Sequence, residues 1–202
     1  MRAGDQMADS TSARWPNLFI AKQFLEPDVC REIVAEMSAA QADAATVYGR
    51  STSGSVDQNV RQTLRIRPSV ASVEMIVRRL LGVKDLVEKH FDVALSECED
   101  PQFLRYREGD FFVAHQDGNT GMTRLDTERR LVSTVIFLSH ESDSPQPDAH
   151  CGGSLLFTDY RSDSNFHMIG EPGMLVAFRA ETTHEITPVT HGERYSIVSW
   201  YR

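Results

Sequence analysis

From Ala94 to the C-terminus the chain is a series of short apolar runs of strand length, separated by turn residues. Many short strands at this spacing are typical of an antiparallel sandwich or barrel. The expected strands cover residues 102–106, 111–115, 131–139, 154–159, 165–169, 174–179, 185–188 and 194–201, with an earlier strand within 17–24 and longer loops at 119–129 and 141–150. The pattern predicts a mainly β fold, a double-stranded β-helix of the jelly-roll type.

Two helices are expected before this β-rich part. Pro27 suits the first turn of a helix, and apolar residues recur at helical spacing from there to about Ala40. Ser69 can cap a second helix that ends near Phe91, and Gly82 is expected to break or kink it. Both helices are predicted to support one face of a sheet.

The whole chain has the size of one domain. We expect a disordered tail over residues 1–14 and a single domain over 15–202, made of a helical support region (15–93) and a β-helix core (94–202). Hydrophobic residues make up 41% of the chain, which is enough for a real core. No pattern in the sequence indicates the oligomeric state.

Charge and cysteine usage narrow the classes of partner and the compartment. A formal net charge of -8 argues against nucleic acid or an anionic membrane as the main partner, although it leaves a basic peptide open. No apolar run approaches membrane-spanning length, and the N-terminus has no apolar secretory core. Three cysteines, Cys30, Cys98 and Cys151, lie far apart and are expected to be reduced thiols, which favours a cytoplasmic location.

A candidate metal site begins with His115 and Asp117. On a strand these two side chains share a face, because successive side chains point to opposite faces. A distal histidine, His184, would complete the two-histidine, one-carboxylate triad of non-haem Fe(II) oxygenases. The alternative is a structural hydrogen-bonded pair. The remaining histidines, His150 among them, fit no ligand spacing.

A second candidate site lies ten residues after this distal histidine, in an alternating strand. Arg194 and Ser196 fall on the same face as Val198 and Trp200. A buried arginine is costly unless an anion meets it, and its planar fork suits a carboxylate. The pattern therefore indicates iron together with a small dicarboxylate. Alternatively, Arg194 pairs with a neighbouring glutamate on the surface.

These residues form part of an ordered set of motifs. The set comprises Tyr106-x-x-Gly109 before His115-x-Asp117, Arg130 before LVSTVIFL, Gly152-Gly153-Ser154 before Leu156-Phe157, Pro172-Gly173 before Val176 and Phe178, and HEITPVTHGERYSIVSW. From about Asn17 onward the chain resembles the 2-oxoglutarate/Fe(II)-dependent dioxygenases of the prolyl 4-hydroxylase type. It departs from their pattern at Phe112 and Phe137, where those proteins commonly have tyrosine, so proline as the substrate is less firmly indicated.

The resemblance implies an enzyme that hydroxylates an unactivated C–H bond while 2-oxoglutarate is decarboxylated to succinate. Its cofactors would be Fe(II), 2-oxoglutarate and O2, with ascorbate as a reductant, and its substrate a peptidyl residue or a small molecule. Tyr106 and Ser133 would join Arg194 and Ser196 around 2-oxoglutarate. The segment Tyr48 to Gln62, rich in Ser, Gly and Asn, would form a lid over the substrate.

Two other functions remain open from the residues alone. The first is a cupin-like metalloenzyme that does not use 2-oxoglutarate, against which the Arg194 and Ser196 pair argues. The second is a non-catalytic metal-binding or oxygen-sensing module, against which the complete ligand set argues.

Overall fold

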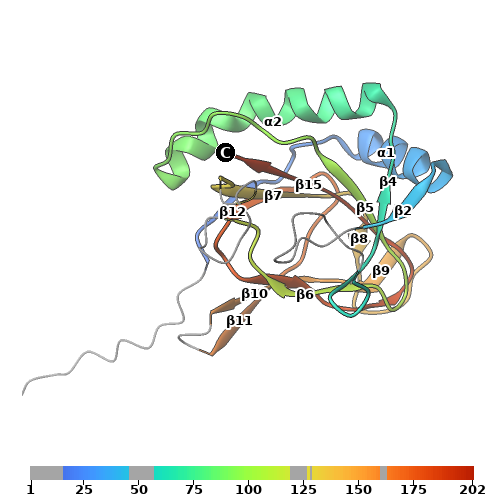
Figure 1. The fold of residues 1–202 in the computed structure, drawn as a ribbon. Coiled ribbons are helices and arrows are strands. Elements are labelled where there is room, and N and C mark those ends of the chain that lie inside the picture. The colour runs from blue at the N-terminus through green and yellow to red at the C-terminus, as the bar shows by residue number, and fades with distance from the viewer. Residues whose placement is uncertain (1–15, 46–56, 119–126, 128, 160–162) are drawn as a thin grey trace, which may run out of the picture.

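Two antiparallel sheets face each other in the computed structural model, which describes residues 16–45, 57–118, 127, 129–159 and 163–202 (Figure 1). The larger sheet has the strand order β1-β12-β7-β15-β5-β4-β2. Its strands are β1 (Leu18–Ala21), β12 (Leu175–Arg179), β7 (Val132–Phe137), β15 (Arg194–Tyr201), β5 (Gln102–Tyr106), β4 (Leu64–Ile66) and β2 (Ala42–Ala44). Strands from the predicted helical region therefore form both edges of this sheet.

The second sheet has five strands in the order β11-β10-β13-β6-β3. They are β11 (Ser164–Met168), β10 (Leu155–Asp159), β13 (His184–Ile186), β6 (Phe111–His115) and β3 (Arg61–Gln62). A third, small sheet combines β14 (Val189–His191), β9 (Ala149–Gly152) and β8 (His140–Glu141). The expected jelly-roll arrangement is thus present, with non-sequential neighbours in each of the two large sheets.

The inner faces of the two large sheets share an apolar core. Its buried side chains come from both sheets and include Leu104, Val135, Phe157, Val176 and Phe178. Alternate residues of β7 point into this core, since Val135 and Phe137 belong to it while Val132 and Ile136 belong to the core on the other side of the sheet. The interior therefore lies between the sheets, where β5, β7 and β15 present one face each.

The outer face of the larger sheet is covered by the helices α1 (Pro27–Ala39) and α2 (Val70–Phe91), which lie across it in Figure 1. Proline stands in the first turn of α1, and the Ser69 side chain accepts a hydrogen bond from the Ser72 amide at the start of α2, as expected. Among the described residues no helix is both long and apolar enough to cross a membrane.

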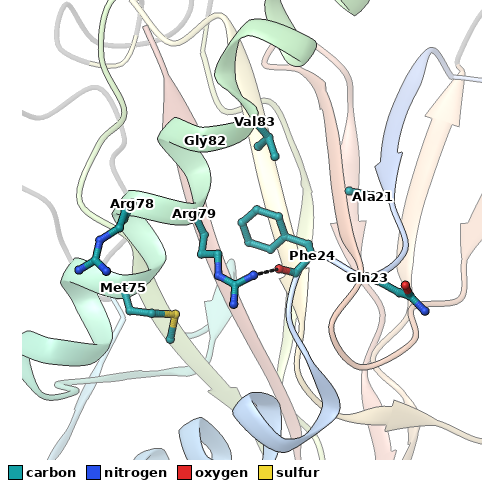
Figure 2. Close-up of a pocket in the computed structure, with 8 residues that line it drawn as sticks. All are labelled: Ala21, Gln23, Phe24, Met75, Arg78, Arg79, Gly82 and Val83. Carbon is teal, nitrogen blue, oxygen red and sulfur yellow. Dashed lines mark hydrogen bonds between the residues drawn. The ribbon is translucent and has the colours of Figure 1, made fainter.

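The predicted break at Gly82 is wrong. Helix α2 runs without interruption to Phe91, because Leu80 and Val87 continue its buried face and their packing outweighs the roughly 1 kcal/mol that glycine costs in a helix. Gly82 instead lines an outer surface pocket with Phe24 and Arg79, which donates a hydrogen bond to the Phe24 carbonyl (Figure 2).

Two further expectations have different outcomes. The loop expected over 141–150 is present between β8 and β9, and only its ends belong to these strands, which pair in parallel. The expected tail over 1–14, and the expected lid over its residues 48–56, lie outside the described residues, so the lid stays a prediction. The last part of that segment forms β3, which pairs with β6.

Candidate metal centre and anion pocket

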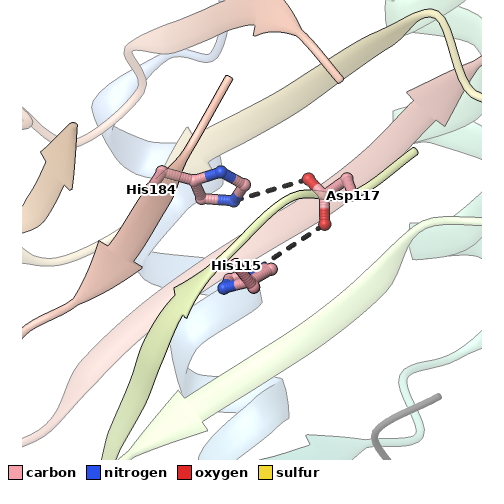
Figure 3. Close-up of side chains that lie close together, drawn as sticks. All are labelled: His115, Asp117 and His184. Carbon is pink, nitrogen blue, oxygen red and sulfur yellow. Dashed lines mark ion pairs between the residues drawn. The ribbon is translucent and has the colours of Figure 1, made fainter. Parts of the chain in front are cut away.

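The side chains of His115, Asp117 and His184 converge between the sheets (Figure 3). The Nε2 atom of His115 lies 3.6 Å from Asp117 Oδ1, and the Nε2 atom of His184 lies 3.4 Å from Asp117 Oδ2. One donor atom from each residue falls within 4.8 Å of the other two. Two imidazole nitrogens and one carboxylate oxygen at this spacing can hold a single metal ion.

Pairing between β6 and β13 brings the two histidines together. His184 lies directly opposite His115 in the register of these antiparallel strands. Asp117 lies beyond the end of β6 and not on the strand, and its amide donates a hydrogen bond to the carbonyl of Ala180 at 2.9 Å. The convergence predicted from strand alternation is therefore present, although the carboxylate comes from the irregular segment that follows the strand.

Backbone carbonyls orient both imidazole rings. The Nδ1 atom of His115 lies 2.8 Å from the Val113 carbonyl oxygen, and that of His184 lies 2.9 Å from the Thr182 carbonyl oxygen. A carbonyl can only accept, so Nδ1 carries the hydrogen in both rings and Nε2 keeps its lone pair. Such an outer partner fixes the tautomer of a ligating histidine.

The carboxyl group of Asp117 is held in its ionised form. Burial raises its pKa, but the facing His184 and His115 together with a hydrogen bond from Ser133 Oγ (2.7 Å) outweigh burial, so the pKa lies below its ordinary range. Burial, aided by the neighbouring His115, lowers the pKa of His184 to about 4. The site therefore offers the neutral imidazole of His184 and the ionised carboxylate of Asp117 at neutral pH.

Ser133 has a partner that the sequence did not indicate, and its expected place around 2-oxoglutarate stays a prediction. Its hydroxyl donates to Asp117 and so belongs to the carboxylate of the triad. Ser196 and Tyr106, the other residues expected around 2-oxoglutarate, both contact Arg194.

Arg194 is fully enclosed at the other end of the interior, with 2% of its surface exposed. Its Nη1 donates to Ser196 Oγ at 2.8 Å, and its guanidinium carbon lies 5.2 Å from the Tyr106 ring centre and 5.7 Å from that of Phe137. Its Nη2 has no hydrogen-bond partner in the described part of the chain. A buried guanidinium that keeps an unpaired hydrogen-bond donor is well suited to bind an anion.

Two neighbours of Arg194 escaped the sequence reasoning. A Cβ at Gly153, where φ is +66°, would lie 2.9 Å from Arg194 Cδ and 3.6 Å from His150 Cδ2, so glycine is needed for this close approach. Burial is the main cause that lowers the pKa of His150 to about 4, and the neighbouring charges of Arg194 and His140 act in the same direction. The double glycine was a usable signal, but ligand spacing could not reveal a histidine that lies beside an arginine.

Arg130, the other arginine of the motif set, already has an anionic partner. Its Nε and Nη2 atoms donate to the two carboxylate oxygens of Glu99 at 2.8 and 2.7 Å. Its guanidinium also stacks over the Trp200 ring, 3.7 Å from the ring centre. Arg194 is therefore the better candidate for binding a dicarboxylate.

The fold and the donor set together fit one class of protein, the jelly-roll oxygenases that use a mononuclear non-haem iron. The chain has residues suited to the metal ion and residues suited to an anionic cosubstrate. The mixed nitrogen and oxygen donors suit Fe(II), and the unpartnered Nη2 of Arg194 suits a second, anionic group.

Comparison with known proteins leads to the same class. Residues 101–202 match the model of the 2OG-Fe(II) oxygenase superfamily. A PKHD-type hydroxylase of Paracoccus denitrificans (strain Pd 1222) is 33% identical over 180 residues, covering 84% of this chain and 72% of the relative. A PKHD-type hydroxylase of Klebsiella pneumoniae (strain 342) is 31% identical over 186 residues, covering 86% and 75%.

Solved structures agree on the fold. A Pseudomonas putida prolyl-4-hydroxylase superposes with a TM-score of 0.69 at 23% identity, covering 93% of each chain. A Trichoplax adhaerens prolyl hydroxylase, solved with a hypoxia inducible factor peptide fragment, gives 0.68 at 17% identity, covering 93% of this chain and 84% of the other. The chain belongs to the 2OG-Fe(II) oxygenase superfamily, and the protein is an oxygenase that depends on Fe(II), 2-oxoglutarate and O2.

Proposed function

We propose that His115, Asp117 and His184 hold Fe(II), and that Arg194 and Ser196 bind the distal carboxylate of 2-oxoglutarate. The observation that carries this proposal is the unpartnered Nη2 of the buried Arg194 on the inner face of the sheet that also presents Ser133 to Asp117. Membership of the 2OG-Fe(II) oxygenase superfamily argues against the cupin-like and the non-catalytic alternatives.

Strand β7 supports the link between the two sites. Ser133, which bonds to Asp117, and Phe137, which lies near Arg194, are on the same face of this strand because they are four residues apart. A short dicarboxylate along this face would reach both the metal and the guanidinium.

The chain's own residues have separate tasks in this proposal. Ser196 holds one arm of the Arg194 guanidinium, so that the other arm meets the carboxylate. Ser133 orients Asp117 in the same way. The buried rings of Phe157 and Phe178, which flank His184, exclude water from the reacting centre. Fe(II) bound with 2-oxoglutarate and O2 supplies the oxidant for the C–H bond, with succinate and CO2 as coproducts.

For the substrate we propose a peptidyl residue, with proline as the first candidate. Support comes from two structural neighbours, the Pseudomonas putida prolyl-4-hydroxylase and the peptide-bound prolyl hydroxylase of Trichoplax adhaerens. The net charge of -8 favours a peptide of basic or neutral character over an acidic one.

The test is a substrate screen that follows succinate formation with Fe(II), 2-oxoglutarate and ascorbate. Proline-containing peptides of basic and acidic character are compared with free amino acids, and hydroxylation is confirmed by the mass of one added oxygen atom. His184→Ala serves as the inactive control. Stimulation by free amino acids alone would contradict the peptidyl assignment.

A further inference from the structure

Strand β6 departs from regular alternation next to His115. Opposite it on β13, His184 pairs with His115 and Ile186 pairs with Phe112, so three steps along β6 match two steps along β13. An extra residue of this kind is a β-bulge, which redirects the neighbouring side chains. Phe112 and His115 would lie on opposite faces of a regular strand, but the bulge brings them to the same face.

On this face the two rings stack. Their centres are 3.6 Å apart and their planes differ by 18°. Arg61, the residue of β3 that pairs with Phe112, places its guanidinium carbon 4.7 Å from the centre of the phenyl ring. Arg61 is itself buried, with 9% of its surface exposed, so strand β3 is connected to His115 through one aromatic ring.

The stack restrains a motion that the hydrogen bond leaves free. The bond from Nδ1 to the Val113 carbonyl, which lies within the bulge, fixes the direction of the imidazole in its own plane. It does not stop the ring from tilting about that bond. A phenyl ring packed flat against the imidazole opposes this tilt and so keeps Nε2 directed at Asp117.

The other histidine is held differently. The ring of His184 meets Phe178 edge to face, with centres 4.7 Å apart and planes at 65°. Its side chain is 6% exposed, whereas that of His115 is 19% exposed. The His115 ring also lies 4.3 Å from the His184 ring, centre to centre, at 52°. Only the ring of Phe112 lies flat against it among the described residues, so the tilt of His115 depends most strongly on Phe112.

We propose that Phe112, supported by Arg61, is a positioning residue for His115 that raises the affinity of the metal site and couples it to strand β3. This inference rests on the proposed function, since it takes His115 as a ligand. Phe112 need not touch the metal, because it acts through the orientation of the imidazole.

The experiment titrates the metal-free protein with Co(II), whose absorption bands report coordination without turnover. Phe112→Leu removes the ring and should weaken Co(II) binding about tenfold, the low end of the loss typical for an outer partner of a ligating histidine. Phe112→Tyr keeps the ring and should bind within about twofold of the parent, while Arg61→Gln should fall between the two variants. Phe166→Leu removes a ring of the same sheet that stacks on Phe157 and should change nothing.

Proton NMR of the Co(II) protein separates positioning from general loosening. Each ligating histidine gives its own shifted, exchangeable Nδ1–H signal. In Phe112→Leu the signal of His115 should broaden through exchange with water while that of His184 stays sharp. Equal loss of both signals would indicate general loosening and overturn the inference.

The outcomes also distinguish this inference from the function on which it rests. Failure of the parent protein to bind Co(II) would overturn the proposed metal site itself. Binding by the parent, with equal affinity and sharp signals in Phe112→Leu, would overturn only the positioning role. If circular dichroism shows that Phe112→Leu does not fold, Arg61→Gln decides, because parental affinity in that variant would contradict the coupling to β3.

Discussion

The two faces of the last strand, β15, differ in whether their buried polar groups have hydrogen-bond partners. On the outer face, under the helices, the Tyr201 hydroxyl donates to the Leu80 carbonyl at 2.7 Å, and the Tyr195 hydroxyl contacts Ser38 at 2.9 Å. On the inner face, Arg194 Nη2 and Trp200 Nε1 are buried with no partner in the described part of the chain. The tyrosine hydroxyls on the outer face of this strand thus have hydrogen-bond partners, whereas two N–H donors on its inner face have none in the described residues.

This difference separates the needs of folding from the needs of binding. A buried polar group without a partner costs free energy, so a face used only for packing pairs every such group. Donors left unpaired on the inner face are stabilised only when a ligand arrives. The inner face should therefore govern binding with little benefit to stability, and the outer face should do the reverse.

The largest expected effect comes from the metal triad, whose carboxylate accepts a hydrogen bond from the inner face of the larger sheet through Ser133. His184→Ala should weaken Fe(II) binding by more than about a hundredfold, beyond the 10–100-fold loss typical when only an outer partner of a ligand is removed. Iron content is measured after equilibrium dialysis. The matched control is His167→Ala, which removes an exposed histidine of β11. Full iron occupancy in His184→Ala would remove this residue from the ligand set.

Next in size is the loss of 2-oxoglutarate binding in Arg194→Ala. A charge-assisted hydrogen bond contributes about 1.5–3 kcal/mol, so affinity should fall roughly ten- to hundredfold while iron binding is retained. Arg194→Lys should recover part of the loss, because it keeps the charge but not the planar fork. Calorimetric titration with 2-oxoglutarate gives the affinities.

Arg130→Gln is the control for this measurement, since its guanidinium is taken up by Glu99. It should leave the affinity for 2-oxoglutarate unchanged. A normal affinity in Arg194→Ala combined with a loss in Arg130→Gln would assign the anchor to Arg130 and break the contrast between the two faces.

A third effect concerns acid stability beside Arg194. The pKa of buried His150 is about 4 in the folded protein against an ordinary 6.5, so the unfolded chain binds the extra proton between these values. Stability is then lost as pH falls from 6.5 towards 4. This group alone should cost roughly 2 kcal/mol between pH 7.5 and pH 5, and His150→Gln should remove that loss.

Urea unfolding at the two pH values measures this effect. His167→Gln, an exposed histidine variant, should keep the acid loss of the parent protein. An acid loss in His150→Gln equal to that of the parent would show that His150 is protonated in the folded state, and that Arg194 does not exclude a second cation.

The smallest effects compare the two faces directly through stability. Tyr201→Phe removes only the hydroxyl that bonds to Leu80 and should lower the free energy of unfolding by about 1 kcal/mol, with no change in 2-oxoglutarate affinity. Arg194→Met replaces a buried cation by an apolar chain of similar length, and should leave the protein without 2-oxoglutarate equally stable or about 1 kcal/mol more stable. A large stability loss in Arg194→Met would show that the inner face also serves folding.

Much of the site followed from local patterns. The spacing of His115 and Asp117 predicted a shared direction, and alternation along β15 placed Arg194, Ser196 and Trp200 inside. Period-two patterns succeed there because successive strand residues point to opposite faces of the sheet, one against the helices and one towards the interior. The same reasoning failed at Gly82, where packing of the helix face overrode the low helix propensity of glycine.

What the sequence determined by itself is therefore the fold class, the two helices, the donor residues and the buried arginine, since each depends on neighbours within a few residues. Only the tertiary structure decided that a bulge turns Phe112 against His115, that His150 lies beside Arg194, and that early strands complete both sheets. These features depend on register between strands distant in the chain. Register is set by the packing of the whole interior, and no local periodicity encodes it.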